Sequence, residues 1–137
     1  GYVPKYLDAL KKVFSLDEEN VYALGFSGGG FRLWDDIVCK AEQLPRFQGV
    51  ILVGSAKQSF DPPEKPEKAA TVILVGDAAD SNFKSRPEAE KVLKDKGYEV
   101  IVHEHSQGHS MARKPLKAVF EWIAEQIKAS RKRPRRR

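Results

Sequence analysis

The sequence predicts an α/β protein with three α/β/α layers, built on a mainly parallel sheet of about four strands. Two observations carry this prediction. Short runs rich in valine, isoleucine and leucine alternate along the chain with longer segments of helical periodicity. Runs that are apolar nearly throughout are typical of strands buried on both faces of a parallel sheet. Right-handed crossovers between such strands would place helices on both sides of the sheet.

The strands are expected where these apolar runs lie. The runs occupy residues 21–26, 49–54, 71–76 and 98–103. Because the first run is apolar nearly throughout, we expect it to be buried on both faces. The segment 55–70, between the second and third runs, contains Pro62, Pro63 and Pro66, and this proline content predicts a loop.

Helices are expected between and around these strands, at residues 4–14, 31–44, 85–97 and 114–128. Pro45 ends the second helix, because the residue before a proline avoids the helical conformation. Ser85 and Glu88 have the spacing of a capping box at the start of the third helix, and Gly97 suits its end. Cys39 lies on the apolar side of the second helix, where we expect a small buried core residue.

One domain is expected over residues 1–130, followed by a basic, disordered tail at residues 131–137. The tail holds six of the 24 lysines and arginines, and the remainder carries 18 basic against 19 acidic residues. The globular part is therefore close to neutral, which argues against a nucleic-acid-binding surface spread over the domain. The tail has no aromatic residues to stack on bases. We expect a solvated end, and contact with nucleic acid or a nuclear-localisation signal is the less favoured alternative.

Nothing in the sequence points to a membrane or to secretion. No apolar run approaches the roughly 20 residues that span a bilayer, and no signal peptide is recognisable before the first helix. Cys39 is the single cysteine, so no disulfide can form within the chain, which is typical of reducing compartments. We expect a cytoplasmic protein that does not bind membranes.

A candidate nucleophile follows the first apolar run. Residues 25–29 read Gly-Phe-Ser-Gly-Gly, a G-x-S-x-G pattern between an expected strand and an expected helix. In such a turn the serine takes a strained backbone conformation, and a Cβ on the flanking glycines would collide with the strand or helix. Ser27 would then present its Oγ beyond the sheet, beside the free N–H groups of the helix start.

Carboxylates and imidazoles are expected at the same edge of the sheet. Asp77 and Asp80 follow the third strand, and His105 and His109 follow the fourth. The carboxyl ends of parallel strands meet at one edge, which is where ligands bind. A serine is a weak nucleophile until a base takes its proton, and a carboxylate behind an imidazole base fixes its tautomer. These residue types therefore predict a Ser–His–Asp site.

With these motifs the chain resembles the C-terminal half of an α/β-hydrolase. The resemblance rests on G-F-S-G-G around Ser27, I-L-V-G-D-A-A-D ending at Asp80 and S-Q-G-H-S around His109, in the family's order. It covers residues 3–129 and is similar in character to small serine esterases, including dienelactone-hydrolase-like and polyester-depolymerase-like members. The resemblance implies a partial α/β-hydrolase fold and hydrolysis of carboxylic esters through an acyl-enzyme.

The resemblance also implies roles for the site residues. Ser27 would be the nucleophile, His109 the base, and the backbone N–H of Gly28 one donor to the oxyanion. The acid is left open between Asp80, which we favour, and Asp77. The family usually places its acid three residues after the glycine that ends the strand. Here that glycine is Gly76, so Asp80 comes one position later than usual and Asp77 two positions earlier.

No cofactor or metal is expected for this chemistry. His103 and His105 are interpreted as ordinary strand-end histidines. Together with His109 they have a spacing that is not a familiar pattern of zinc ligands, and no cysteine lies near them.

The resemblance further implies that part of the enzyme is missing. The family fold has strands before the first one found here, and a loop among them supplies a second oxyanion donor. We therefore expect a truncated or split enzyme, whose first strand is an unpaired edge able to pair with a missing half or another subunit. The expected small-molecule partner is an ester substrate. The alternative is a non-catalytic remnant that serves as a binding or interaction module.

Overall fold

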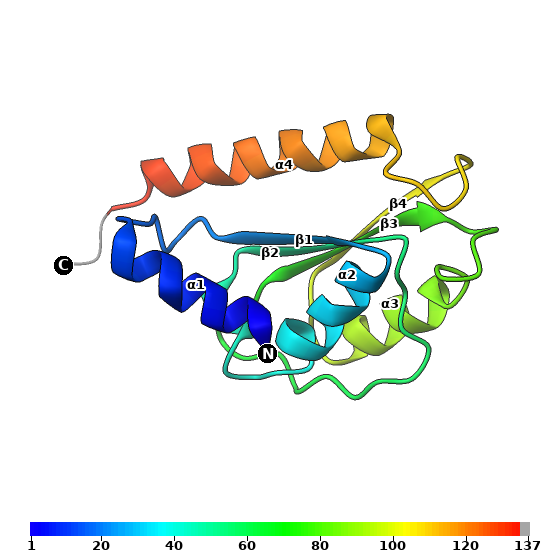
Figure 1. Ribbon diagram of the computed structural model, residues 1–137, viewed down its shortest axis with the longest axis horizontal. Coiled ribbons are helices and arrows are strands. Elements are labelled where there is room, and N and C mark those ends of the chain that lie inside the picture. Colours follow the sequence, from blue (N-terminus) through cyan, green and yellow to red (C-terminus); the bar gives the residue numbers. More distant parts are fainter. Residues whose placement is uncertain (135–137) are drawn as a thin grey trace.

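A four-stranded parallel sheet lies between two layers of helices (Figure 1). The structure is a computed structural model and describes residues 1–134. Its elements are α1 (Tyr2–Val13), β1 (Tyr22–Phe26), α2 (Gly28–Leu33), the π-helix η1 (Trp34–Val38), the 3-10 helix η2 (Leu44–Arg46), β2 (Gly49–Val53), β3 (Thr71–Asp77), α3 (Arg86–Asp95), β4 (Val100–His105) and α4 (Arg113–Lys132). The strands follow one another across the sheet in chain order. The predicted α/β class and parallel sheet are confirmed.

The two faces of the sheet bury two separate apolar cores. On one face α1, α2 and α3 pack over the side chains of Val50, Leu52, Val72 and Leu74. On the other face α4 packs over Ile51, Val53, Ile73 and Val75 with its own Leu116 and Val119. Successive strand residues point to opposite faces, so the apolar runs of β2 and β3 serve both cores.

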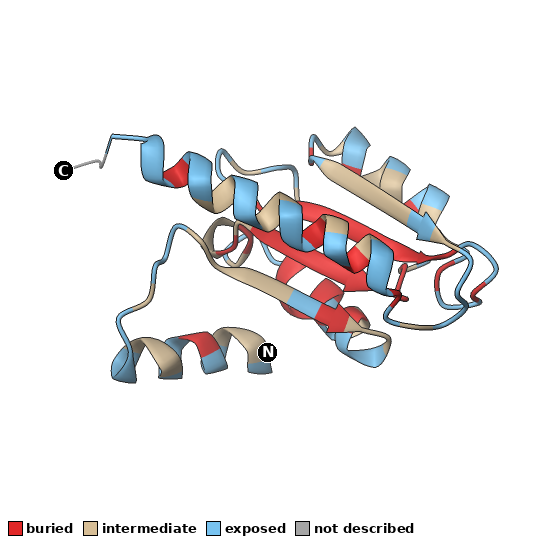
Figure 2. Ribbon diagram, turned by 90° about the horizontal axis from the view of Figure 1, so that it is seen from above, coloured by how far each residue is buried: buried red, intermediate tan, exposed pale blue. Residues whose placement is uncertain are grey.

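Burial is uneven across the sheet, as Figure 2 shows. Every residue of β2 and β3 is buried, whereas the outer strands β1 and β4 are mostly half-buried. Leu24 in the middle of β1 is 39% exposed. The expectation that the first strand is buried on both faces is therefore wrong, because β1 is an edge strand with a neighbour on one side only. Apolar composition alone does not report a strand's place in the sheet.

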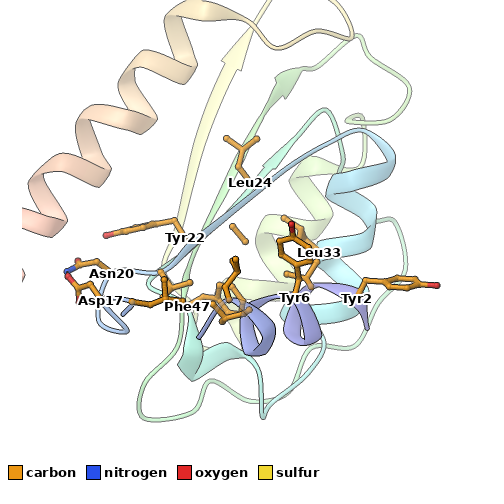
Figure 3. A pocket seen from close by; sticks show the side chains of 14 residues that line it. Tyr2, Tyr6, Asp17, Asn20, Tyr22, Leu24, Leu33 and Phe47 are labelled. Carbon is orange, nitrogen blue, oxygen red and sulfur yellow. The ribbon is translucent and has the colours of Figure 1, made fainter. Parts of the chain in front are cut away.

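An apolar groove of about 650 Å³ runs along the outer side of β1 (Figure 3). Most of its walls come from α1, from β1 and from the chain between them, and Leu33 of α2 and Phe47 after η2 complete the lining. Tyr2 and Tyr6 are 75% and 71% exposed. The unpaired side of the sheet and the free side of α1 thus form one continuous apolar surface.

The helix that follows β1 departs from its expected course. It begins at Gly28, widens into a π turn at Trp34–Val38 and ends by Cys39, whose N–H donates to the Trp34 carbonyl over 3.0 Å. The turn holds the fully buried Trp34 indole, whose Nε1–H donates to the Ser55 carbonyl. The expected helix over 31–44 is therefore too long, and Pro45 lies inside η2 instead of ending it.

Two further expectations shift at element ends. β4 starts two residues later than expected, because Gly97 has a φ of +91° and the Tyr98 N–H still donates to the Leu93 carbonyl of α3. Cys39 is half-buried instead of a core residue, and burial raises the pKa of its thiol. Segment 55–70 is a loop as predicted, because it contains no helix or strand.

The last helix is longer than its apolar stripe suggested. α4 runs to Lys132, so the first two residues of the expected tail, Arg131 and Lys132, are helical. The rest of that expectation falls largely on residues 135–137, which lie outside the described residues. Within residues 1–134, none of the helices combines the length and apolarity needed to cross a membrane.

Candidate active site

Ser27 occupies the sharp turn between β1 and α2. It has φ +54° and ψ −120°, and it is the one residue other than glycine with a positive φ among residues 1–134. Such a conformation costs an L-residue of order 1–3 kcal/mol, so the surroundings must impose it. The Ser27 N–H donates to the Val53 carbonyl over 2.8 Å, and the Ser27 carbonyl accepts from the Phe31 N–H over 3.0 Å. The predicted strained turn is confirmed.

The glycines of the turn have unequal roles. A Cβ on Gly25 would lie 2.5 Å from the Gly29 carbonyl oxygen, and one on Gly30 would lie 1.9 Å from Ser55 Oγ. Gly28 and Gly29 have no heavy atom within 4 Å of an added Cβ. We expected a Cβ at either end of the G-x-S-x-G motif to collide with its surroundings. This expectation is confirmed for Gly25 and is wrong for Gly29. Gly30, outside the five-residue pattern, has the second close approach.

The His109 imidazole lies within hydrogen-bonding distance of Ser27. It lies in the loop between β4 and α4, and its Nε2 is 2.9 Å from Ser27 Oγ. The imidazole packs against the Phe26 ring, with 4.9 Å between ring centroids. A Cβ on Gly54, which has a φ of +60°, would lie 3.2 Å from Cε1 and Nδ1 of this ring. Phe26 and Gly54 therefore shape the space that the imidazole occupies.

Asp80 completes a hydrogen-bonded chain of three side chains. Its Oδ2 lies 2.5 Å from His109 Nδ1, and its Oδ1 accepts the Asn82 N–H over 3.0 Å. A carboxylate can only accept, so Nδ1 carries the proton and Nε2 is free to accept from the serine hydroxyl. The Asp80 side chain is 4% exposed and the His109 side chain 36%. The hydrogen-bond network thus links a buried acid, Asp80, through a partly exposed base, His109, to the Ser27 hydroxyl.

The other candidate residues are not part of the Ser27–His109–Asp80 hydrogen-bond network. His103 and His105 are on β4, and His105 Nδ1 accepts the Gln107 N–H over 3.0 Å. Within residues 1–134 no cluster of three histidine, cysteine, aspartate or glutamate side chains is placed to hold a metal ion. Gly28 is an exposed residue at the start of α2, so its N–H has no acceptor inside the helix.

Comparison with solved structures identifies the architecture. The structure of the Bacillus cereus carboxylesterase matches 90% of this chain with a TM-score of 0.72 and 17% sequence identity. Arabidopsis thaliana SOBER1 matches 92% with a TM-score of 0.73 and 20% identity. MGS-M1, an α/β hydrolase enzyme from a Medee basin deep-sea metagenome library, matches 90% with a TM-score of 0.64 and 14% identity. The chain has an α/β-hydrolase fold. No family model and no curated protein sequence matches it.

The α/β-hydrolase fold is present in part. The chain spans 58% of the Bacillus cereus carboxylesterase and 61% of both SOBER1 and MGS-M1. The partial fold inferred from the three motifs is confirmed. Since these identities are low, the likeness concerns the fold.

Asp77, the alternative acid, does not contact the His109 imidazole and instead binds two backbone N–H groups. Its two carboxylate oxygens accept the N–H groups of Ala79 and Gly108, each over 2.8 Å, while Asp80 is the aspartate against the imidazole. These two backbone hydrogen bonds lower the pKa of the Asp77 carboxyl. Sequence reasoning missed this arrangement, together with Gly30 and Gly54. A run of three glycines at 28–30 was the available signal for Gly30.

Proposed function

We propose that this chain is a serine hydrolase that acts on carboxylic esters through an acyl-enzyme. The observation that carries the proposal is the unbroken line of hydrogen bonds from Ser27 Oγ to His109 and on to Asp80. A hydroxyl paired in this way with an imidazole, and an imidazole held by a buried carboxylate, are the parts that acyl transfer needs.

In the proposed first half-reaction Ser27 Oγ attacks the ester carbonyl carbon while His109 Nε2 takes the hydroxyl proton. The negative charge on the carbonyl oxygen is stabilised by the Gly28 N–H at the start of α2. The imidazolium, stabilised by Asp80, then gives its proton to the leaving alcohol as the C–O bond breaks. The product is an acyl ester of Ser27 and a free alcohol.

In the second half-reaction water replaces the alcohol. His109 takes a proton from the water as its oxygen attacks the acyl carbon, and the proton passes to Ser27 Oγ as the acyl–serine bond breaks. The acid leaves and the starting state returns. The solved structures of similar fold that are named esterases support ester hydrolysis as the reaction class.

The proposal is tested by pre-steady-state hydrolysis of p-nitrophenyl acetate. We expect a burst of p-nitrophenol equal to the amount of protein, and an added acetyl group on the peptide containing Ser27, because the acyl-enzyme forms before it is hydrolysed. Ser27→Ala should lose both signals. Ser106→Ala, a change at an exposed serine of the neighbouring loop, should keep them. Absence of both signals from the wild-type chain would leave the non-catalytic binding module as the better account.

We further propose that efficient turnover needs a second polypeptide segment, which adds a strand to the free side of β1. Three observations support this. The chain spans 58% of the Bacillus cereus carboxylesterase and 61% of SOBER1, which it resembles in fold. β1 (Tyr-Ala-Leu-Gly-Phe) carries none of the charges or prolines with which proteins protect an edge strand. The groove beside it is apolar and continuous with α1.

This second proposal makes a quantitative claim about the chain alone. Removal of one oxyanion donor typically costs ~10²–10³ in kcat. The turnover number per reactive Ser27, measured on material shown by sedimentation to be monomeric, should therefore lie well below the ~10 s⁻¹ that is typical of enzymes. A monomer that turns over at the typical rate would contradict the need for another segment.

The cytoplasmic location inferred from cysteine usage stays a prediction.

A further inference from the structure

Two separate loops carry the acid and the base, and one side chain lies between them. Asp77 is the last residue of β3, and its partner in the parallel register is His105, the last residue of β4. Beyond these two residues the strands part. One chain turns into the loop of Asp80 and the other into the loop of His109.

The Asp77 carboxylate joins these two loops again. Oδ1 accepts the N–H of Ala79 over 2.8 Å, and Oδ2 accepts the N–H of Gly108 over 2.8 Å. Each of these N–H groups belongs to the residue directly before a member of the hydrogen-bonded chain, Asp80 in one loop and His109 in the other. Gly108 has a φ of +70°, a backbone conformation that glycine adopts without strain.

The environment of Asp77 favours its ionised form. The residue is 9% exposed, and the two backbone N–H groups are the main reason that the pKa of its carboxyl lies below the ordinary value of 3.8. A charge-assisted hydrogen bond is roughly twice as strong as a neutral one. An ionised carboxylate with two amide donors is therefore a firm tie between the loops.

We propose that Asp77 is a positioning residue, whose carboxylate sets the distance between the Asp80 loop and the His109 loop so that the imidazole meets both Asp80 and Ser27. This inference rests on the proposed serine hydrolase function. Asp77 takes no proton from the substrate and touches no reacting atom. Its effect passes through the backbone of Ala79 and Gly108.

The substitution Asp77→Asn distinguishes this role from that of an ordinary turn residue. Asparagine keeps the size of the side chain but replaces one acceptor oxygen with an NH₂ group, which cannot accept from a backbone N–H. One of the two loops must then lose its tie. A displacement of about 1 Å in a catalytic group can cost ~10²-fold in rate.

The first experiment needs no activity. In amide NMR spectra of the ¹⁵N-labelled chain, recorded while the pH is lowered, the Ala79 and Gly108 resonances should shift together with one midpoint below pH 3.8. Because the pKa of Asp77 is lowered, its carboxyl stays ionised at every pH above that value and becomes protonated as the pH falls through it. Two different midpoints, or a response of Ala79 alone, would overturn the tie between the loops.

The second experiment measures the consequence at Ser27. We expect Asp77→Asn to lower kinact for a fluorophosphonate probe by 10- to 100-fold while KI and the far-UV circular dichroism stay unchanged. Asp95→Asn, at an exposed ion-paired carboxylate at the end of α3, should label as wild type. A folded Asp77→Asn protein that labels at the wild-type rate would overturn the positioning role.

The outcomes separate this inference from the proposed function. If the wild-type chain does not label at all, the hydrolase proposal fails, and the NMR titration still decides whether Asp77 ties the two loops. If Asp77→Asn does not fold, the wild-type titration again decides, because it uses the unaltered chain.

Discussion

The carboxyl edge of the sheet and the outer side of β1 differ in how well their side chains are paired and covered. At the carboxyl edge, Ser27, Asp80 and His109 come from three separate connections and meet within hydrogen-bonding distance. Along the outer side of β1, apolar side chains such as Tyr6 and Leu24 surround a groove of about 650 Å³ and are in part exposed. Within residues 1–134 the polar side chains of the first region have hydrogen-bond partners, whereas apolar side chains of the second region remain partly exposed.

Both regions belong to the same strand. β1 leads into the strained turn of Ser27 at its carboxyl end, while its free side lines the groove. The three hydrogen-bonded side chains at the carboxyl edge need only the ends of a few neighbouring strands to meet. The strand that carries the nucleophile is an edge strand, and its free side is only partly covered. Chemistry at the carboxyl edge and the covering of β1 can therefore be tested separately in this molecule.

The largest expected effect comes from removing the base at the carboxyl edge of the sheet. His109→Ala should slow fluorophosphonate labelling of Ser27 by ~10²–10⁴-fold, because a positioned general base contributes about that much. The measurement is the second-order labelling constant from intact mass spectrometry. His103→Ala, on β4 but outside the hydrogen-bonded chain, should label as wild type. Equal rates for all three proteins would remove the base from the account.

The next effect compares a central strand with the edge strand. Leu74→Ala in β3 should lower the free energy of unfolding by ~2–5 kcal/mol, since Leu74 is fully buried and its truncation leaves a cavity. Leu24→Ala in β1 should cost less than ~1 kcal/mol, because this side chain is already partly in water. Urea denaturation of both variants gives the two values. Similar losses would mean that β1 is as well packed as the centre of the sheet.

A smaller effect tests the glycines of the serine turn. Gly30→Ala should destabilise the chain by ~1–3 kcal/mol, because its Cβ would overlap Ser55 Oγ. Gly29→Ala is the matched control, with open space at the same helix start. It should raise the stability by up to ~1 kcal/mol through helix propensity. Thermal unfolding followed by circular dichroism measures both, and a destabilised Gly29→Ala would show that the turn itself has no room there.

The smallest effect on stability concerns the free side of β1. Leu24→Lys should change the free energy of unfolding by ~0.5 kcal/mol or less, because it lies at a partly exposed edge. It should nevertheless reduce self-association in sedimentation velocity, since a charge on an edge strand opposes pairing with other strands. Unchanged sedimentation of a self-associating chain would place its contacts elsewhere.

Much of the carboxyl edge could be predicted from sequence because its signals are local. A glycine-rich turn after an apolar run located Ser27, and the order of strands placed Asp80 and His109 at the same edge. The preference for Asp80 over Asp77 agrees with the geometry, although it rested on a resemblance. What Asp77 does instead depends on the backbone of another loop, 31 residues away in the chain. No local pattern encodes such a contact.

Errors of prediction arose where tertiary packing decides. The helix after β1 shortens around the buried indole of Trp34, and apolar periodicity continues past that point without recording the change. The half-exposure of Leu24 depends on the absence of a neighbouring strand, which the composition of β1 cannot report. Lys132 remains helical although the apolar stripe of α4 has ended.

The central claim is that this chain, without another polypeptide, assembles a reactive serine. Its most direct test is incubation of the wild-type chain with a fluorophosphonate probe at neutral pH, followed by peptide mapping. We expect one probe per chain, located on Ser27, with much slower labelling of His109→Ala. A folded wild-type chain that stays unlabelled, or that carries the probe on another serine, would contradict the claim.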